Sequence, residues 1–160
     1  MLTEAGSGDS PGGRVLRLLA PMLGLAIARI RLNHAGALII DFGMPLSNLD
    51  YVRGEWRLAV FNSVWRLQSA STVLVASGDD RVRIDTALQG LRGVELDSME
   101  VDEQLLGASY RFGDKELRVF PVYTGPDDRY DAWTVWNPLR KQIRIGPGAR
   151  VRIGEEADVQ

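Results

Sequence analysis

Residues 25–42, LAIARIRLNHAGALIIDF, place two apolar stretches on either side of a short turn. Apolar and polar residues partly alternate over Leu25–Leu32, which is typical of a strand with one buried face. Ile27 and Arg29, two residues apart in this strand, are expected to share a face. Asn33-His34-Ala35-Gly36 has the chemistry of a hairpin turn, because Asn and Gly tolerate positive φ. The stretch therefore predicts a β-hairpin.

Short strands of the same kind follow along most of the chain. They are expected at residues 37–42, 56–61, 64–67, 72–76, 94–101, 105–112, 116–122, 132–136, 142–145 and 150–153. Strands that are grouped, instead of alternating with helices, predict a strand-dominated α+β fold with antiparallel sheets.

One clear helix connects the two groups of strands. Asp80–Leu91 has apolar residues at i, i+4 and i+7, Asp79 or Asp80 can cap its N-terminus, and Gly93 lies just past its end. A weaker helical pattern covers Arg14–Ala20.

The chain resembles two copies of one unit, 14–78 and 79–154, so the expected fold is a single domain of two pseudo-repeated halves. The matching segments are Phe42-Gly43 and Phe112-Gly113, Leu58–Phe61 and Leu117–Phe120, and Trp65–Leu67 and Trp133–Val135. Residues 1–13 are expected to form a flexible leader and 155–160 a tail. The expected core contains Ile27, Leu38, Ile40, Phe42, Val60, Trp65, Leu88, Leu91, Leu96, Leu105, Phe112, Val119, Trp133 and Val135.

Composition excludes several kinds of site. The 160 residues contain no cysteine, which excludes a disulfide scaffold, a thiolate metal site and a cysteine nucleophile. His34 is the only histidine, and in a turn it is expected to be solvated and not a catalytic base. A net charge of −2 gives no global field that would steer the chain to nucleic acid or a membrane. We expect no cofactor and no metal.

An acidic run keeps a second class of protein open. Glu95, Asp97, Glu100, Asp102 and Glu103 could ligate a divalent cation or supply an acid and a base, as in a small enzyme or a metal- or ligand-binding protein. The competing interpretation is the exposed face of a sheet strand.

A basic run lies closer to the C-terminus, at Arg140, Lys141, Arg144, Arg150 and Arg152. Interleaved with tryptophans, it could bind single-stranded nucleic acid, although the favoured interpretation is two strands with outward arginines. The acidic and basic runs nearly cancel, so they can also face each other within the domain or across a homodimer. A structural homo-oligomeric module is a third alternative.

The segment 14–28 superficially resembles a secretion signal, with an apolar run from Leu18 and a small-residue site at Ala26-x-Ala28. Acidic residues precede it, however, and the strand continues through the site to Arg29 and Arg31. The apolar run is also too short to span a bilayer. We therefore expect a cytoplasmic protein with no membrane partner.

The loop YTGPDDRYD, residues 123–131, is too long for a tight hairpin and is rich in tyrosine, aspartate and arginine. Tyr and Arg concentrate binding energy in protein interfaces, and paired aspartates can neutralise a basic partner. The competing interpretation is a solvated loop with Tyr130 against Trp133. The predicted partner-binding residues are Tyr123, Asp127, Asp128, Arg129, Tyr130 and Trp136.

The two halves together resemble a family of small bacterial proteins of unknown function. The residues that carry the resemblance are Leu117-x-Val-Phe120, the loop, Tyr130-Asp-Ala-Trp133 and Gly146-Pro-Gly148. It covers roughly 23–148, and an insertion at 44–55 departs from the pattern. Some relatives of that family are regarded as immunity proteins of polymorphic toxin systems, and the family has no established catalytic residues. The resemblance implies an immunity protein that holds a cognate toxin inactive. Because no catalytic constellation is present, we expect a non-enzymatic binding protein with no catalytic residue, and Asp127 and Asp128 favour a basic target.

Overall fold

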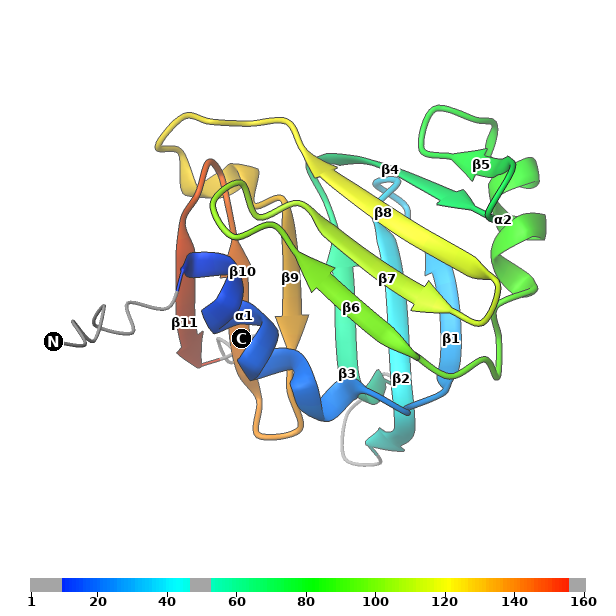
Figure 1. Ribbon diagram of the computed structural model, residues 1–160, viewed down its shortest axis with the longest axis horizontal. Coiled ribbons are helices and arrows are strands. Elements are labelled where there is room, and N and C mark those ends of the chain that lie inside the picture. Colours follow the sequence, from blue (N-terminus) through cyan, green and yellow to red (C-terminus); the bar gives the residue numbers. More distant parts are fainter. Residues whose placement is uncertain (1–9, 47–52, 156–160) are drawn as a thin grey trace, which may run out of the picture.

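The computed structural model describes residues 10–46 and 53–155, which form two antiparallel sheets that face each other across an apolar core (Figure 1). The six-stranded sheet has the order β1 (Ile27–Leu32), β2 (Leu38–Leu46), β3 (Arg53–Val60), β9 (Trp133–Trp136), β10 (Lys141–Ile145) and β11 (Val151–Glu155). The five-stranded sheet has the order β5 (Val73–Ala76), β4 (Ser63–Gln68), β8 (Lys115–Pro121), β7 (Ala108–Phe112) and β6 (Ser98–Val101). A strand-dominated fold with antiparallel sheets is thus confirmed.

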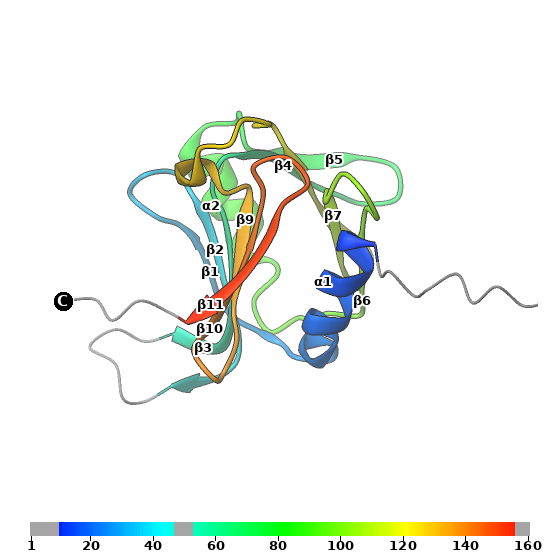
Figure 2. The same cartoon turned by 90° about the vertical axis from the view of Figure 1, so that its left-hand side faces the viewer.

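Helices cover the open sides of the two sheets. α1 (Pro11–Leu19) continues into the 3₁₀ turn η1 (Ala20–Met22) and lies beside β6, whereas α2 (Arg81–Gln89) lies beside β1 and β5 (Figure 2). A second 3₁₀ turn, η2 (Asp128–Tyr130), lies in the connection from β8 to β9. Val15 and Leu19 of α1 are fully buried, so this helix completes the core.

Capping residues fix the starts of both helices. The Asp80 carboxylate accepts a hydrogen bond from the Arg83 backbone N–H at 3.0 Å, which confirms Asp80 as the N-cap of α2. Ser10 caps α1 in the same way, accepting from the Gly13 N–H at 3.1 Å.

α1 begins earlier than the leader prediction allows. Gly12 donates its N–H to the Glu103 carbonyl at 3.0 Å, and a Cβ on Gly12 would lie only 2.2 Å from the Asp102 carbonyl oxygen. Residues 11–13 are therefore helical and packed, because glycine lets the helix backbone approach this close. The rest of the expected leader, 1–9, and the tail residues 156–160 lie outside the described residues, while Glu155 ends β11.

The hairpin predicted from residues 25–42 is confirmed, but one face assignment is wrong. A β-bulge at Ala28 shifts the register between Ile27 and Arg29. Ile27 is buried in the core, whereas Arg29 lies exposed on the outer face of the six-stranded sheet. The extra residue of the bulge moves Arg29 and Arg31 to the opposite face from the one that alternation predicts.

Leu105 is the one expected core residue that is exposed. Its relative exposure is 76%, while its neighbour Leu106 is fully buried. β7 begins only at Ala108, so residues 105–107 form a turn in which Leu106 has a φ of +59°. That left-handed backbone directs Leu106 inward and leaves Leu105 on the surface.

Each sheet is assembled from both halves of the chain. β1, β2 and β3 are joined to β9, and β6, β7 and β8 are joined to β4. The described parts of the expected insertion at 44–55 are strand, because β2 extends to Leu46 and β3 starts at Arg53; residues 47–52 lie outside the described part of the chain.

Candidate functional site

The predicted loop connects β8 to β9 and lies at the end of the five-stranded sheet where the β6–β7 turn and the β10–β11 turn also lie (Figure 1). Tyr123 and Tyr130 stack on each other, with ring centroids 4.4 Å apart and an interplanar angle of 18°. The Arg129 guanidinium lies 5.9 Å from the centroid of the Tyr130 ring. Tyr123, Arg129 and Tyr130, three of the predicted residues, therefore lie together.

Hydrogen bonds from two other connections hold this loop. The Gly148 N–H donates to the Tyr123 carbonyl at 2.8 Å, and Arg150 Nη2 donates to the Pro126 carbonyl at 3.1 Å. From the β3–β4 connection, Asn62 Nδ2 donates to the Asp131 carbonyl at 3.0 Å. A loop that is fixed in this way loses little conformational entropy when it binds a partner.

The charges of Asp127 and Arg129 are paired with each other. The Asp127 carboxylate accepts from Arg129 Nε at 3.0 Å and from the Arg129 backbone N–H at 3.0 Å. Hydrogen bonds from the Arg129 side chain, then from its backbone, lower the pKa of Asp127 from 3.8 to about 2. The pair offers a partner less net charge than free aspartates would. Asp128 starts η2, and its side chain lies outside the described part of the structure.

Trp136 does not belong to the stack of Tyr123 and Tyr130. It is half-buried on the outer face of the six-stranded sheet, where it packs against Ile39 and Ala59 and contacts the Phe61 ring edge-on at 6.4 Å. Phe61 also lines a hollow of about 320 Å³ with Arg129, so this face connects Trp136 with one end of the predicted loop.

An apolar groove of about 310 Å³ adjoins the stacked tyrosines. We call it the Tyr123 groove; its lining residues are Asp102, Leu105, Gly107, Phe120, Pro121, Tyr123, Thr124, Gly148 and Ala149. Three of its large side chains are exposed, namely Leu105 by 76%, Tyr123 by 43% and Phe120 by 38%. Val122 and Val64 extend the exposed apolar surface beyond it. The apolar strand pattern that Leu105 and Phe120 fit gives no sign that both side chains lie on the surface.

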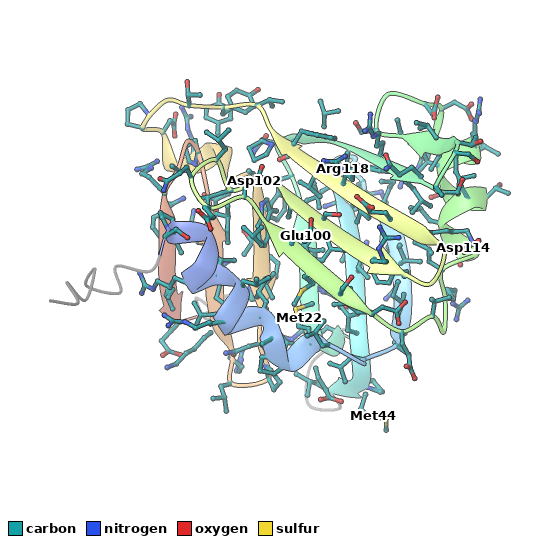
Figure 3. All side chains as sticks on the ribbon, viewed as in Figure 1. Met22, Met44, Glu100, Asp102, Asp114 and Arg118 are labelled. Atoms are coloured by element: carbon teal, nitrogen blue, oxygen red, sulfur yellow. The ribbon has the colours of Figure 1, made fainter. Side chains whose placement is uncertain are left out.

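The acidic run is divided between structural and exposed roles. Asp97 accepts a hydrogen bond from the Gly113 N–H at 2.6 Å and so fixes the β7–β8 turn. Asp102 lines the Tyr123 groove, and Glu100 and Asp102 lie on the same side of the sheet as Arg118 (Figure 3). No group of three or more possible metal ligands occurs within residues 10–46 and 53–155.

The basic run holds the loop and does not face the acidic run. Arg144 Nε donates to Asp131 at 2.6 Å, and Arg152 donates both to Asp131 and to the Gly146 carbonyl. Asp131 is 8% exposed, so these ion pairs lie partly buried beneath the loop. The interpretation in which the two runs face each other within the domain is therefore wrong for Arg144, Arg150 and Arg152.

Comparison with known proteins finds no matching family model, no matching curated protein and no matching solved structure. Neither helix in the described ranges has the length and apolar character needed to cross a membrane.

His34 is exposed in the β1–β2 turn, as expected.

Proposed function

We propose that this chain is a non-enzymatic protein-binding module that docks a basic partner protein in the Tyr123 groove. The observation that carries the proposal is the exposure of Leu105, Phe120 and Tyr123 around one hollow. Large apolar side chains gathered on one surface mark interaction sites, and interface energy concentrates in aromatic anchors that fill pockets.

The groove suits an apolar side chain of the partner. A volume of about 310 Å³ accommodates one bulky side chain, and the exposed rings of Phe120 and Tyr123 provide its contact surface. Arg66 and Arg118 contact the Phe120 ring, with guanidinium carbons 5.5 and 5.6 Å from its centroid. Anchors held in place before binding cost little to order.

Unpaired carboxylates argue for a basic partner. Asp102 lines the groove, and Glu100 and Glu103 lie close to it in sequence; none of the three side chains has an ion pair or hydrogen bond within the described residues. Asp102 therefore places one unpaired negative charge in the lining of the groove, and Glu100 lies beside Asp102 in a neighbouring small hollow. Lys or Arg residues that flank the docked side chain would meet these carboxylates, which would speed association and select the partner.

The particular function we propose is that of an immunity protein, which neutralises a toxin by covering a basic surface such as that of a nuclease. This extends the resemblance of residues 23–148 to a bacterial family with such relatives. A binder of this kind needs a rigid scaffold and a complementary surface, and the held loop and groove provide both.

The binding proposal is tested by selecting peptides from a random display library on the purified protein. We expect the enriched peptides to contain a bulky apolar residue flanked by Lys or Arg. Leu105→Glu should weaken their binding by about tenfold or more, because it adds a charge to the apolar groove. The matched control is Val82→Glu, since Val82 is also 76% exposed but lies on α2.

Reversing a charge at the groove tests the same proposal in a second way. Asp102→Lys should slow association with the basic peptides, and raising the salt concentration should reduce the difference. Asp114→Lys, at the other end of the same sheet (Figure 3), should have little effect. Enrichment of acidic peptides, or equal binding by the Leu105→Glu and Val82→Glu variants, contradicts the proposal.

The immunity function has its own test. Reading frames beside the gene are expressed one at a time, and a frame that arrests growth is expressed again together with this protein. We expect the wild type and Val82→Glu to restore growth and Leu105→Glu to fail. If no neighbouring frame is toxic, or if all variants protect equally, the immunity proposal is wrong.

We also infer that the two halves are copies of one unit that pair across a pseudo-two-fold axis. Replacing each strand of the order β1-β2-β3-β9-β10 by its counterpart in the other half gives β6-β7-β8-β4-β5, which is the order of the second sheet. Further support comes from Phe42 and Phe112, which match in sequence and stack with centroids 6.2 Å apart.

A further inference from the structure

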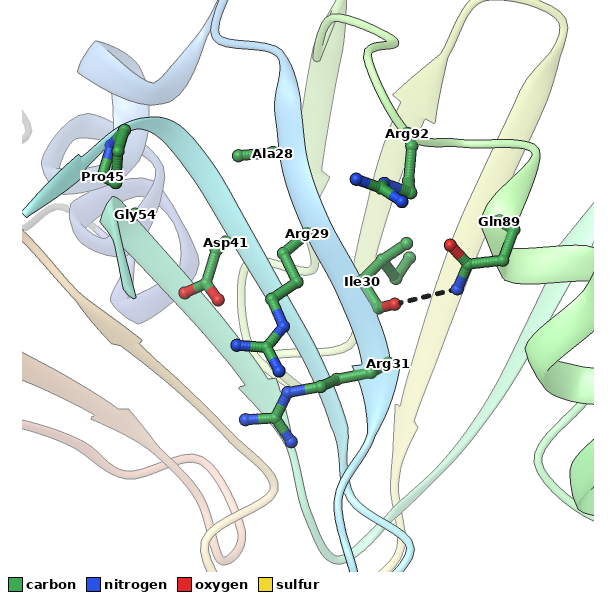
Figure 4. Close-up of a pocket in the computed structure, with 9 residues that line it drawn as sticks. All are labelled: Ala28, Arg29, Ile30, Arg31, Asp41, Pro45, Gly54, Gln89 and Arg92. Carbon is green, nitrogen blue, oxygen red and sulfur yellow. Dashed lines mark hydrogen bonds between the residues drawn. The ribbon is translucent and has the colours of Figure 1, made fainter. Parts of the chain in front are cut away.

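A second hollow lies on the other sheet, away from the Tyr123 groove. It encloses about 510 Å³ on the outer face of the six-stranded sheet, at the β1 edge. Arg29 and Arg31 extend into it from β1, and Asp41 faces it from β2 (Figure 4). Gln89, the last residue of α2, and Arg92, three residues after it, form the opposite wall. We call this hollow the Arg31 cleft. It shares no lining residue with the Tyr123 groove.

The cleft holds three arginines that form no ion pair within the described residues. Within the described ranges, the guanidinium groups of Arg29, Arg31 and Arg92 have no ion pair or hydrogen bond. Asp41 is the acidic residue of the cleft, but Arg57 already binds it through two hydrogen bonds of 2.7 and 3.1 Å. Asp41 is only 2% exposed, and its one negative charge acts on Arg31 as well as on Arg57, so the cleft keeps an excess of positive charge.

Arg31 is the residue that most requires a ligand. Its Nε is buried and, in the part of the chain that is described, has no hydrogen-bond acceptor. Burial, then repulsion by Arg29 and Arg57, lowers the pKa of Arg31 from its ordinary value, and attraction by Asp41 offsets part of this shift. Arginine nevertheless stays protonated at physiological pH. A buried donor without an acceptor is costly, and an anion in the cleft would supply the acceptor.

The bulge at Ala28 explains why these charges meet. In the six-stranded sheet Arg29 pairs with Asp41 and Arg31 pairs with Ile39. Arg29 and Arg31 therefore occupy neighbouring outward positions on the edge strand. The Gln89 side chain fixes the other wall, because its Nε2 donates to the Ile30 carbonyl at 3.3 Å (Figure 4). This bond leaves the Gln89 side-chain carbonyl and its second N–H for a ligand.

We propose that the Arg31 cleft binds a small organic phosphate monoester. Guanidinium groups present paired N–H donors that match the oxygens of a phosphate, and three of them suit a dianion better than a single carboxylate. The volume lies in the range of small-molecule sites and exceeds what phosphate alone fills. Ala28 and Pro45, which also line the cleft, provide an apolar surface for the organic part.

Titration calorimetry on the full chain tests this assignment. The probes are glycerol 3-phosphate, adenosine monophosphate, inorganic phosphate and citrate. We expect at least one monoester to bind more tightly than inorganic phosphate or citrate. Arg31→Gln and Arg92→Gln should each weaken that binding by about tenfold or more. Arg83→Gln is the matched control, because Arg83 is an exposed arginine of α2 that does not line the cleft.

Each other outcome overturns the proposal. Absence of binding by both monoesters excludes the phosphate-ester assignment, and tighter binding of citrate assigns the cleft to carboxylates. If inorganic phosphate binds as tightly as the esters, the cleft does not recognise the organic part of a monoester. Arg92 lies outside the strands and helices, so Arg92→Gln keeps the test valid if Arg31→Gln fails to fold. A positive result here is independent of whether the Tyr123 groove binds a protein.

Discussion

Trp133 ties the two sheets together at the level of a single residue. It is fully buried on β9, its Nε1 donates to the Leu106 carbonyl at 3.0 Å, and its ring meets Tyr110 of β7 edge-on at 6.0 Å. The same hydrogen bond holds the turn that exposes Leu105. A core residue therefore shapes one wall of the Tyr123 groove.

Trp133→Phe should lower the free energy of unfolding by about 2–4 kcal/mol, because it leaves a cavity and a buried carbonyl without a donor. Trp136→Phe, on the outer sheet face, should cost less than about 1 kcal/mol. Urea unfolding followed by circular dichroism measures both variants. Equal losses would show that the buried hydrogen bond contributes nothing.

Tyr110 makes stability sensitive to alkaline pH. Burial raises the pKa of its hydroxyl well above the ordinary 10.0, and the hydroxyl has no hydrogen-bond partner among the residues that the structure describes. The unfolded chain loses this proton near pH 10 while the folded chain keeps it, so the folded state binds more protons above that pH. Stability present below about pH 10 is therefore lost as pH rises further.

Tyr110→Phe should remove this part of the pH dependence. At neutral pH the variant should be as stable as the wild type or more stable, since it deletes an unpartnered buried hydroxyl. Urea unfolding at neutral pH and above about pH 10 measures the slope. The same alkaline loss in both proteins would contradict the assignment.

At the scale of elements, η2 is held by its own charges. Because hydrogen bonds from Arg129 keep the pKa of Asp127 at about 2, the carboxylate stabilises the turn above pH 3.8, and this contribution is lost as pH falls through about 2. Arg129→Gln should raise the pKa of Asp127 from about 2 toward 3.8. A carboxyl-carbon NMR titration measures the shift, with Arg118→Gln as control. An unchanged pKa would mean that the pair does not form in solution.

The elements themselves were predictable from sequence to a large extent. The β1–β2 hairpin follows from Asn33 and Gly36, and α2 begins at its predicted cap, Asp80. The alternation of apolar and polar residues did not predict the bulge at Ala28, because a bulge depends on how the strand pairs with β2 and not on the local sequence. It failed again at Leu105 and Leu106, where a positive φ at a leucine reverses which side chain is buried.

The candidate sites were only partly predictable. The composition of the loop 123–131 predicted a binding site, and Tyr123 does line a groove. Its neighbour Leu105 comes from another strand connection, so their proximity depends on sheet order. The Arg31 cleft was missed for the same reason, since Arg92 lies far from Arg29 and Arg31 in sequence and the bulge decides which way they face.

At the scale of the whole molecule, neither half can complete a sheet alone. Residues 79–155 contribute β6–β8 to one sheet and β9–β11 to the other, and in each case the neighbouring strand comes from the first half. A fragment of residues 79–155 would expose the strand edges that pair with β3 and β4. We expect this fragment to lack a cooperative thermal transition, measured by circular dichroism. A cooperative transition in the isolated fragment would contradict a shared core.

The most direct test of the central claim, that a basic partner docks in the Tyr123 groove, is a two-dimensional amide NMR titration of the full chain with the basic peptide enriched by display. The account predicts that the largest shift changes occur at Leu105, Phe120, Thr124 and Gly148, and that Leu105→Glu abolishes them. Shift changes concentrated instead on the outer face of the six-stranded sheet, around Arg31 or Trp136, would contradict it.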